Sequence, residues 1–265
     1  IITNQLAVKS LSGQKTWEDA DNKYETRPDS IEIELKRSYT DPATGTERTE
    51  SIEKRTVRAP WTWRFDGLPE QHTSGAAYQY FVEETNVDAR YTAKQTEEDP
   101  LSLTNTLAVQ DIAVQKHWAD SNNRYSTRPA SVLIELVSST GARYSGMLFP
   151  SNGWTYTFTD LPKYSEKGEL IEYTLSETVP AGYAVSGEIT QPKASKEDKY
   201  TAELTNALIE TQVTVQKQWA GGSYRPTVSI RLLDCIRLVD TVQLGNGIWS
   251  YTFEHLPRYR TDGTE

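Results

Sequence analysis

The sequence predicts an all-β protein built from tandem β-sandwich domains. Three observations carry this prediction: a long internal repeat, runs in which apolar and polar residues alternate, and turn signals at regular spacing between those runs. No amphipathic helix longer than a turn or two is visible. The repeats are joined without a Gly/Ser-rich or Pro-rich spacer, so we expect the domains to stand end to end as a rod.

A Gln-Lys-x-Trp tag defines the repeat. Its lysines are Lys15, Lys116 and Lys217, so the period is 101 residues both times (116 − 15 and 217 − 116). A Thr-Asn tag keeps the same step, and its asparagines are Asn4, Asn105 and Asn206. A fixed period of this length indicates tandem copies of one domain.

The tags set the expected domain bounds. Complete domains are expected over residues 7–107 and 108–208, and an incomplete N-terminal part of a third over residues 209–265. Residues 1–6 match the end of each copy, so we interpret them as the tail strand of a preceding domain or a remnant at the fragment boundary. A copy of about 100 residues is large enough to bury its own core.

Each copy contains the same runs in the same order. The apolar positions of residues 31–35 alternate with glutamates, and an aromatic run at 61–65 follows and leads into Leu-Pro, where proline ends a strand. Asn152-Gly153 and Asn246-Gly247 precede the later aromatic runs and favour tight hairpin turns. A further alternating run, at residues 78–82 in the first copy, recurs in the second.

The composition excludes some classes of function. A net charge of −9 argues against nucleic-acid binding, which needs a basic face. No apolar run reaches the roughly 18 residues of a membrane span, and no signal peptide is visible. Cys235 is the single cysteine, so an intrachain disulfide is excluded, and we interpret it as a small core residue.

The tag lysines lie in the apolar stripe of their strands. Lys116, for example, shares a face with Ile112, Val114 and Trp118, because alternate residues of a strand point the same way. The tag asparagines lie between leucines on the same face. Glu84 and Glu177 end a later strand on its apolar face, so each complete copy points a lysine, a glutamate and an asparagine into its core.

Such a trio has a specific chemistry. Burial lowers the pKa of a lysine and raises that of a glutamate. An uncharged amine is a nucleophile, and a protonated carboxyl can polarise an amide and shuttle protons. Lysine can then attack the asparagine amide and expel ammonia, which leaves a Lys–Asn isopeptide bond.

Two other interpretations of the lysines stay open. A single lysine in an alternating strand is usually a snorkelling side chain or the result of a wrong register. A buried but unreacted salt bridge is the intermediate case. The Lys-to-Asn spacing of 90 in both copies (105 − 15 and 206 − 116) favours the reactive trio.

The ordered motifs resemble the B-type repeat of the Gram-positive collagen adhesin, the Cna-B family. They are Val-Gln-Lys-x-Trp, Arg-Pro, Trp-x-Tyr-x-Phe-x-x-Leu-Pro, Glu-Thr-Val-Pro-Ala-Gly-Tyr at 177–183, and Leu-Thr-Asn, and the resemblance covers nearly the whole chain. It implies an immunoglobulin-like sandwich of reversed topology. It also implies self-forming isopeptide bonds assisted by a glutamate, with these trios: Lys15, Glu84 and Asn105; Lys116, Glu177 and Asn206.

The first and third copies depart from the pattern. In the first, residues 87–91 replace Val-Pro-x-Gly-Tyr, Gly13 replaces a bulky residue, and Glu83 beside Glu84 leaves open which glutamate faces the core. The glutamate of the third copy is expected near position 272, beyond the last residue. Lys217 is therefore expected to be unpaired, as is Asn4.

The resemblance implies stalk or spacer repeats of an adhesin or pilus protein, with no turnover of an external substrate. Expected partners are neighbouring repeats and, through other domains of the parent protein, a host matrix or cell-surface ligand. The expected location is the outer surface of a Gram-positive cell, with cell-wall anchoring through a C-terminal region beyond this sequence.

Three competing functions are weaker. A ligand-binding module would use exposed aromatic residues such as Trp61 or Tyr164, which we instead expect in the core or at the junctions. A sortase-polymerised pilin would need a sorting signal and an acceptor lysine, and neither is recognisable. The stretches Asp-Ala-Asp-Asn at 19–22 and Asp-Ser-Asn-Asn at 120–123 lack the glycine and distal glutamate of a calcium loop, so we expect turns, no metal and no cofactor.

Overall fold

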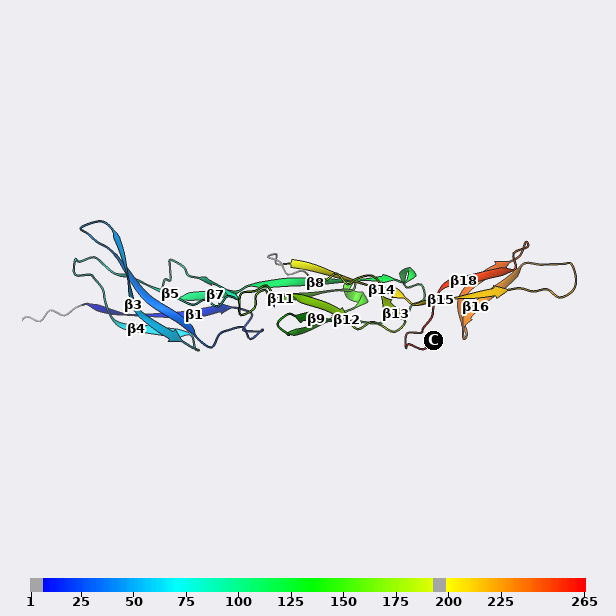
Figure 1. Ribbon diagram of the computed structural model, residues 1–265, viewed down its shortest axis with the longest axis horizontal. Coiled ribbons are helices and arrows are strands. Elements are labelled where there is room, and N and C mark those ends of the chain that lie inside the picture. Colours follow the sequence, from blue (N-terminus) through cyan, green and yellow to red (C-terminus); the bar gives the residue numbers. More distant parts are fainter. Residues whose placement is uncertain (1–6, 193–198) are drawn as a thin grey trace, which may run out of the picture. The chain divides into compact units, whose positions relative to one another are not determined.

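Strands dominate the protein. The computed structural model describes residues 7–192 and 199–265 (Figure 1). The helices of this described part are two single 3-10 turns, η1 (Ser121–Asn123) and η2 (Pro150–Asn152). No helix in the same residues has the length and apolar character needed to cross a bilayer. The predicted all-β class is confirmed, whereas the end-to-end arrangement stays a prediction.

The chain divides into two compact units. The first comprises Ile1–Gln110 together with Asp160–Ile171. Its strands are β1 (Val8–Glu18), β2 (Ile31–Thr40), β3 (Glu47–Val57), β4 (Thr62–Pro69), β5 (Gln79–Glu84), β6 (Tyr91–Lys94) and β7 (Leu103–Leu107). They form a four-stranded sheet in the order β4-β1-β7-β6 and a three-stranded sheet in the order β3-β2-β5.

The core of the first unit lies between these two sheets. Ile33, Leu35 and Val82 from one sheet and Phe65 and Leu103 from the other are buried in a single cluster. These are the positions that the alternating pattern placed on the inner faces, because side chains of a strand alternate between faces. The pattern therefore produces the predicted sandwich.

The second unit comprises Asp111–Thr159 and Glu172–Glu265. The strands of the second copy are β8 (Val109–Ala119), β9 (Val132–Ser138), β10 (Arg143–Leu148), β11 (Thr155–Pro162), β12 (Tyr173–Glu177), β13 (Tyr183–Val185) and β14 (Lys199–Leu208). Their sheet orders, β11-β8-β14-β13 and β10-β9-β12, repeat those of the first copy strand for strand. Ile134, Leu136, Leu175 and Leu204 are buried in this copy.

In both copies the first and last strands are parallel neighbours. β1 pairs with β7 so that Lys15 lies opposite Leu103 and Trp17 opposite Asn105. The pairing of β8 with β14 repeats this register, with Lys116 opposite Leu204 and Trp118 opposite Asn206. Each lysine is therefore offset by two residues from its asparagine on the adjacent strand, and both point to the same face.

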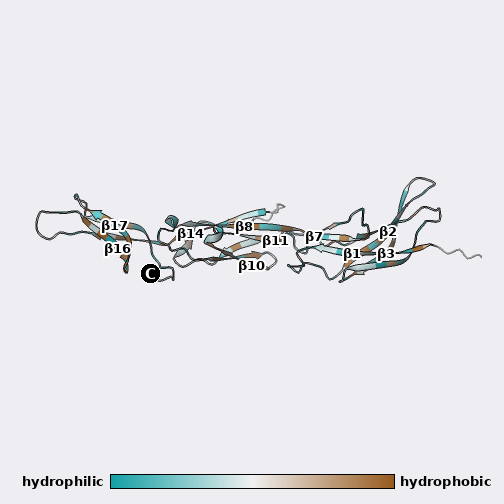
Figure 2. Cartoon of the chain, turned by 180° about the vertical axis from the view of Figure 1, so that it is seen from behind, coloured by the Kyte–Doolittle hydropathy of each residue, from teal (hydrophilic) through white to brown (hydrophobic). Residues whose placement is uncertain are grey.

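Four strands make up the third copy: β15 (Glu210–Gln216), β16 (Val228–Asp234), β17 (Arg237–Leu244) and β18 (Ser250–Pro257). β15 pairs with β18 and β16 with β17, as the first four strands of a complete copy do. Brown and teal segments both occur along these strands in Figure 2. Phe253 and Leu256 are buried in a cluster with Tyr183 and Leu208.

The two Asn-Gly pairs form different turns. Asn246 and Gly247 have φ values of 51° and 86°, and the Ile248 N–H donates to the Gly245 carbonyl at 3.0 Å, so the predicted tight turn is confirmed here. The prediction is wrong for Asn152, which is the last residue of η2. Pro150 begins that 3-10 turn, and only Gly153 takes the left-handed conformation, at φ 66°.

The core interpretation of Cys235 is also wrong. The residue is exposed, with φ 54°, where the chain turns between β16 and β17. The residue type favours burial, but a turn between two antiparallel strands places its side chains at the surface.

Gly13 replaces a larger residue because the backbone of another segment occupies the space. A Cβ at this position would lie 1.8 Å from the Leu101 carbonyl oxygen and 2.5 Å from Trp63 Nε1. In the second copy the equivalent residues are Val114 and Ala202, and both are buried. The first copy thus combines a small residue on the first strand with the larger Leu101 on the segment that packs against it, and the second copy combines Val114 with the smaller Ala202.

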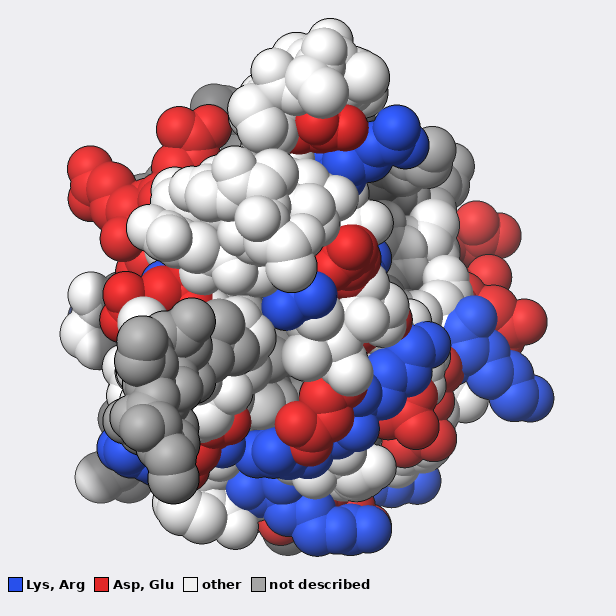
Figure 3. Space-filling view, turned by 90° about the vertical axis from the view of Figure 1, so that its left-hand side faces the viewer, with Lys and Arg blue, Asp and Glu red and all other residues white. Residues whose placement is uncertain are grey.

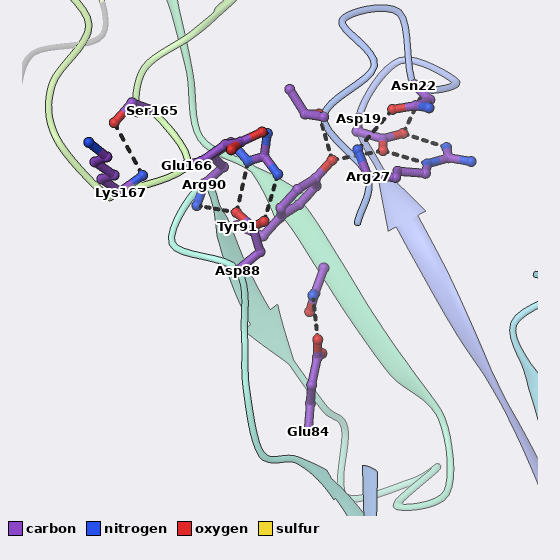
Figure 4. Close-up of polar contacts among 12 residues, drawn as sticks. Asp19, Asn22, Arg27, Glu84, Asp88, Arg90, Tyr91, Ser165, Glu166 and Lys167 are labelled. Carbon is purple, nitrogen blue, oxygen red and sulfur yellow. Dashed lines mark hydrogen bonds and ion pairs between the residues drawn. The ribbon is translucent and has the colours of Figure 1, made fainter. Parts of the chain in front are cut away.

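The divergent stretch at residues 87–91 is closed by an ion pair. Arg90 donates to both carboxylate oxygens of Asp88, at 2.9 and 2.6 Å (Figure 4). The Arg90 side chain also lies 3.4 Å from Glu166, which belongs to the same compact unit. The Asp88–Arg90 pair thus fixes the turn that leads into β6.

Candidate functional site

The candidate site of the first copy lies between the two sheets. Lys15 is buried on the inner face of β1, and its backbone N–H donates to the Trp61 carbonyl at 2.7 Å. Glu84 enters from the last residue of β5 in the opposite sheet. Lys15 Nζ donates to Glu84 Oε2 at 2.5 Å, so an amine and a carboxylate meet across the core.

The asparagine completes the group. Asn105 lies on the central strand β7 and has no solvent exposure. Its Nδ2 donates to Glu84 Oε1 at 3.2 Å, while its Oδ1 has no hydrogen-bond partner. The glutamate therefore contacts both the amine and the amide.

Glu84, and not Glu83, faces this site. The Glu84 side chain is 1% exposed, whereas that of Glu83 is 48% exposed and pairs with Lys36 at 2.6 Å on the outer face. Successive side chains of a strand point to opposite faces, so one residue decides between core and solvent.

The second copy brings the same three residue types together, but here both contacts involve Glu177 Oε2, and Glu177 Oε1 has no hydrogen-bond partner. Lys116 Nζ lies 2.9 Å from Glu177 Oε2, and both side chains are almost completely buried. Asn206 Nδ2 donates to Glu177 Oε2 at 3.3 Å, and Asn206 Oδ1 has no partner. The structure thus brings together the three sequence-predicted residues of each complete copy.

Burial lowers the pKa of the site lysine in each complete copy. Loss of hydration lowers the pKa of Lys15, and the adjacent Glu84 offsets part of that shift. The pKa of Lys116 is lowered for the same reason, with Glu177 opposing the shift. A lowered pKa increases the fraction of uncharged amine, which is the nucleophilic form.

Lys217 lies in a different setting. Its Nζ donates to the Gln218 carbonyl at 3.0 Å, and no glutamate is paired with it in the described part of the chain. Its backbone N–H keeps the bond to the aromatic strand, donating to the Trp249 carbonyl at 2.7 Å. Asn4 falls in residues 1–6, outside the described residues.

Sequence reasoning missed a second polar group beside each trio. Both carboxylate oxygens of Asp19 accept hydrogen bonds from Arg27, at 2.6 and 2.5 Å, and the Asn22 N–H donates to the same carboxylate at 3.1 Å. The Tyr91 hydroxyl donates to Asp19 Oδ2 at 3.2 Å and lies 2.6 Å from the Thr26 hydroxyl. Figure 4 shows Tyr91 reaching toward this ion pair. The Asp-Ala-Asp-Asn stretch at 19–22 is therefore a turn held by an ion pair.

The second copy contains the same polar group. Asp120 accepts from Arg128 at 2.6 and 2.7 Å and from the Tyr183 hydroxyl at 3.0 Å. The Tyr183 hydroxyl lies 2.8 Å from that of Thr127. The spacing of eight from aspartate to arginine recurs in both copies (27 − 19 and 128 − 120), and this signal could have revealed the group.

The two aromatic residues considered as ligand-binding candidates, Trp61 and Tyr164, are partly buried. Trp61 packs against the first core cluster and meets Trp17 edge to face, with ring centroids 5.3 Å apart. Tyr164 is half-buried. On the face shown in Figure 3, basic side chains lie mainly in the lower half, with acidic side chains among them.

The chain is similar in sequence to known proteins. The family described as "Cna protein B-type domain" matches residues 11–106 and 112–207. A collagen adhesin of Staphylococcus aureus is 30% identical over 269 residues, which cover 98% of this chain and 21% of that protein. The chain thus corresponds to about a fifth of this relative's length.

Two solved structures are also similar. The crystal structure of two B repeat units of the S. aureus collagen-binding protein is 26% identical, covers 98% of this chain and 67% of that one, and has a TM-score of 0.36. A streptococcal ancillary pilin is 14% identical, with 95% of this chain and 88% of that chain covered and a TM-score of 0.36.

Proposed function

The chain belongs to the Cna protein B-type domain family, and from this premise we propose that it is a load-bearing segment of a bacterial surface adhesin or pilus protein. Its two complete repeats act as stalk or spacer domains, each closed by a self-formed bond between Lys15 and Asn105 or between Lys116 and Asn206. Their role is structural, and the chemistry occurs once per domain. Binding of a host ligand belongs to other parts of the parent protein, which carries these repeats outside the cell and is anchored to its wall.

The burial of one glutamate between an amine and an amide supports the bond. In each copy the glutamate lies within 2.9 Å of the lysine and within 3.3 Å of the asparagine nitrogen. An isolated buried ion pair is weak evidence for stability, because desolvation offsets its attraction. The same group, placed twice beside a buried amide with a free carbonyl oxygen, fits a reaction better than a purely structural role.

The reaction balances within the trio. The lysine ammonium passes a proton to the glutamate, and the neutral Nζ attacks the asparagine Cγ. After the amide turns about its Cβ–Cγ bond, the protonated carboxyl can donate to Oδ1, which has no other partner. A second amine proton moves through the glutamate to the leaving nitrogen. As the carbonyl re-forms, Oδ1 returns its proton to the carboxylate, the Cγ–Nδ2 bond breaks and ammonia departs. The products are one amide bond, one ammonia and a protonated glutamate.

Proximity of the amine and the amide lowers the activation barrier of the reaction. Holding amine and amide in contact can contribute about 7–11 kcal/mol toward the barrier of such a step. The bond closes a loop of about 90 residues, which in the chain-entropy model stabilises the domain by about 4–5 kcal/mol.

The location of the bond suits a tensile load. It joins the first strand of each repeat to the last, and these strands are parallel neighbours. A pulling force that enters at β1 passes through the bond to β7, so the chain between them carries no load. Lys116 follows Asn105 by only 11 residues, which leaves a short unprotected segment between the two bonds.

Pulling on single molecules tests the proposal. We expect the two complete repeats to resist extension between residues 15 and 105 and between 116 and 206 at forces that unfold ordinary sandwiches. The Lys15→Ala/Lys116→Ala double variant should release both segments. Equal contour-length gains for the parent chain and this variant would contradict the stalk function.

A further inference from the structure

We propose that three aromatic residues beside each trio form a cover that keeps water from the lysine while it reacts. The cover consists of Trp17, Trp61 and Tyr91 in the first copy and of Trp118, Trp154 and Tyr183 in the second. The Asp19–Arg27 pair holds the first cover closed, and the Asp120–Arg128 pair holds the second. Asp19, Arg27 and Tyr91 are then positioning residues. This inference rests on the proposed isopeptide chemistry and assigns a role to residues outside the trio.

Trp17 is the part of the cover that contacts the nucleophile. It lies two residues after Lys15 on the same face of β1, and Lys15 Nζ is 5.2 Å from the centre of its ring. Trp17 also stands opposite Asn105 in the parallel register. Its ring therefore adjoins both reacting residues.

Two further aromatic rings hold Trp17 in place. Trp61 and Tyr91 meet it edge to face, with centroids 5.3 and 5.0 Å from its ring. Trp61 has a φ of 63° and Trp154, its equivalent, 61°. Left-handed backbone is an outlier for bulky residues and persists only where the surroundings enforce it. In both complete copies the fold thus tolerates backbone strain at the tryptophan of the cover whose carbonyl accepts the lysine backbone N–H.

The polar group fixes the cover from its outer side. Arg27 Cζ is 5.9 Å from the centre of the Trp17 ring, and Asp19 holds this guanidinium through two hydrogen bonds. The Tyr91 hydroxyl is tied to the same carboxylate. The Asp19 side chain is completely buried, which is unusual for a carboxylate unless a partner requires it there.

The second copy reproduces the cover. The ring of Trp118 lies 4.7 Å from Lys116 Nζ and 5.5 Å from Arg128 Cζ. Its centroid is 4.9 Å from those of both Trp154 and Tyr183. Two copies that differ at many surface positions share this arrangement, so general packing of a sandwich is a poor explanation for it.

The third copy has the two tryptophans, Trp219 and Trp249, but not the aspartate. Lys217 and Arg225 lie 4.4 and 5.4 Å from the Trp219 ring. Gly221 stands two residues after this tryptophan, where the complete copies have Asp19 and Asp120. Arg225 donates instead to backbone carbonyls, including that of Gly222 at 2.7 Å. The arginine on this tryptophan thus lacks the aspartate partner that it has in the first two copies.

Exclusion of water has a direct effect on the chemistry. The charged and titratable groups around Lys15 are Glu84 from the opposite sheet and, beyond Trp17, Arg27, Asp19 and Tyr91. Opening the cover would hydrate the ammonium and return its pKa toward the ordinary value for lysine. Less neutral amine would then be present at neutral pH, and the bond would form more slowly.

A pulse of cell-free synthesis tests the cover. Synthesis is stopped, samples are held at a series of pH values, and the branched peptides that join residue 15 to 105 and residue 116 to 206 are quantified after digestion. The variants are Asp19→Asn, Tyr91→Phe and, as a control with the same change of charge on an exposed residue of the same loop, Asp21→Asn. The second copy of each molecule is an internal reference.

We expect Asp19→Asn to slow the first bond about tenfold at neutral pH and to move its pH profile upward by about one unit, while the second bond is unchanged. Tyr91→Phe should have a smaller effect in the same direction, and Asp21→Asn none. A normal rate in both Asp19→Asn and Tyr91→Phe, or a slower rate with an unmoved pH profile, would overturn the inference. Absence of both branched peptides from the parent chain would instead refute the isopeptide proposal itself.

Discussion

Glu83 and Glu84 are adjacent in β5 and have opposite environments: the first pairs with Lys36 at the surface, and the second contacts Lys15 between the sheets. Glu83 therefore serves as a control for any substitution of Glu84. The two residues have the same chemistry and nearly the same position in the chain. They differ in which face of the strand they occupy.

Glu84→Gln is expected to prevent formation of the bond in the first copy. The amide cannot carry protons between the amine, Oδ1 and the leaving nitrogen, so the proton shuttle is lost. The intact mass of the denatured variant should then show the loss of one ammonia, from the second copy. Glu83→Gln is the matched control and should still lose two, and equal deficits in the two variants would count against a role for Glu84.

Lys116→Ala is expected to destabilise the second copy strongly. It removes the proposed bond, which would stabilise the domain by about 4–5 kcal/mol, and leaves Glu177 buried without its partner. The thermal midpoint and the lifetime against protease should both fall. His117→Ala changes the next residue, which points outward and is about half exposed, and should leave both quantities unchanged. If the two variants behaved alike, the bond would contribute nothing to stability.

Tyr91 and Tyr183 are expected to limit stability in alkali. Burial, together with the adjacent Asp19 or Asp120, raises the pKa of each hydroxyl to about 12, against a hydrogen bond from threonine that lowers it. A group whose folded pKa is raised contributes stability that is complete below the unfolded pKa of about 10 and is lost as the pH rises from 10 to 12. The loss is at most about 3 kcal/mol for each tyrosine.

Alkaline unfolding followed by circular dichroism and tyrosinate absorbance checks this expectation. Tyr91→Phe/Tyr183→Phe should flatten the fall in stability between pH 10 and 12. Tyr224→Phe, at a residue that is 81% exposed, should not. An unchanged slope in the double variant would show that other groups control the alkaline transition.

Gly13→Ala is expected to lower the stability of the first copy. The added Cβ would overlap the Leu101 carbonyl oxygen, a backbone atom that cannot move without shifting its segment. Overpacking of a core typically costs about 1–3 kcal/mol. The thermal midpoint should fall, whereas Ser12→Ala, at the exposed neighbour, should leave it in place. A midpoint that matched the parent would mean that the segment at Leu101 can give way.

The alternating pattern was enough to predict the sheets and the inward-facing lysines and asparagines. It could not decide between Glu83 and Glu84, because a shift of one residue exchanges the two faces and a pattern defines a strand end poorly. The contact between Asp19 and Arg27 crosses a turn, where periodicity gives no signal. Only its recurrence at Asp120 and Arg128 could have revealed it.

Local chemistry misled the prediction in two places. Asn152 precedes a glycine, as in a hairpin turn, but Pro150 starts a 3-10 turn that takes its place. Cys235 belongs to a residue type that favours the core, yet it lies exposed at a turn. In both cases the conformation of neighbouring residues outweighed the preference of the residue itself.

The intact mass of the denatured parent chain tests the central claim most directly. Measured at a resolution that separates one lost ammonia from none, it should fall short of the mass calculated from the sequence by two ammonias, one for each complete copy. A mass equal to the calculated value would show that Lys15, Glu84 and Asn105, and their equivalents, are buried hydrogen-bonded groups without a covalent bond, and would contradict the account.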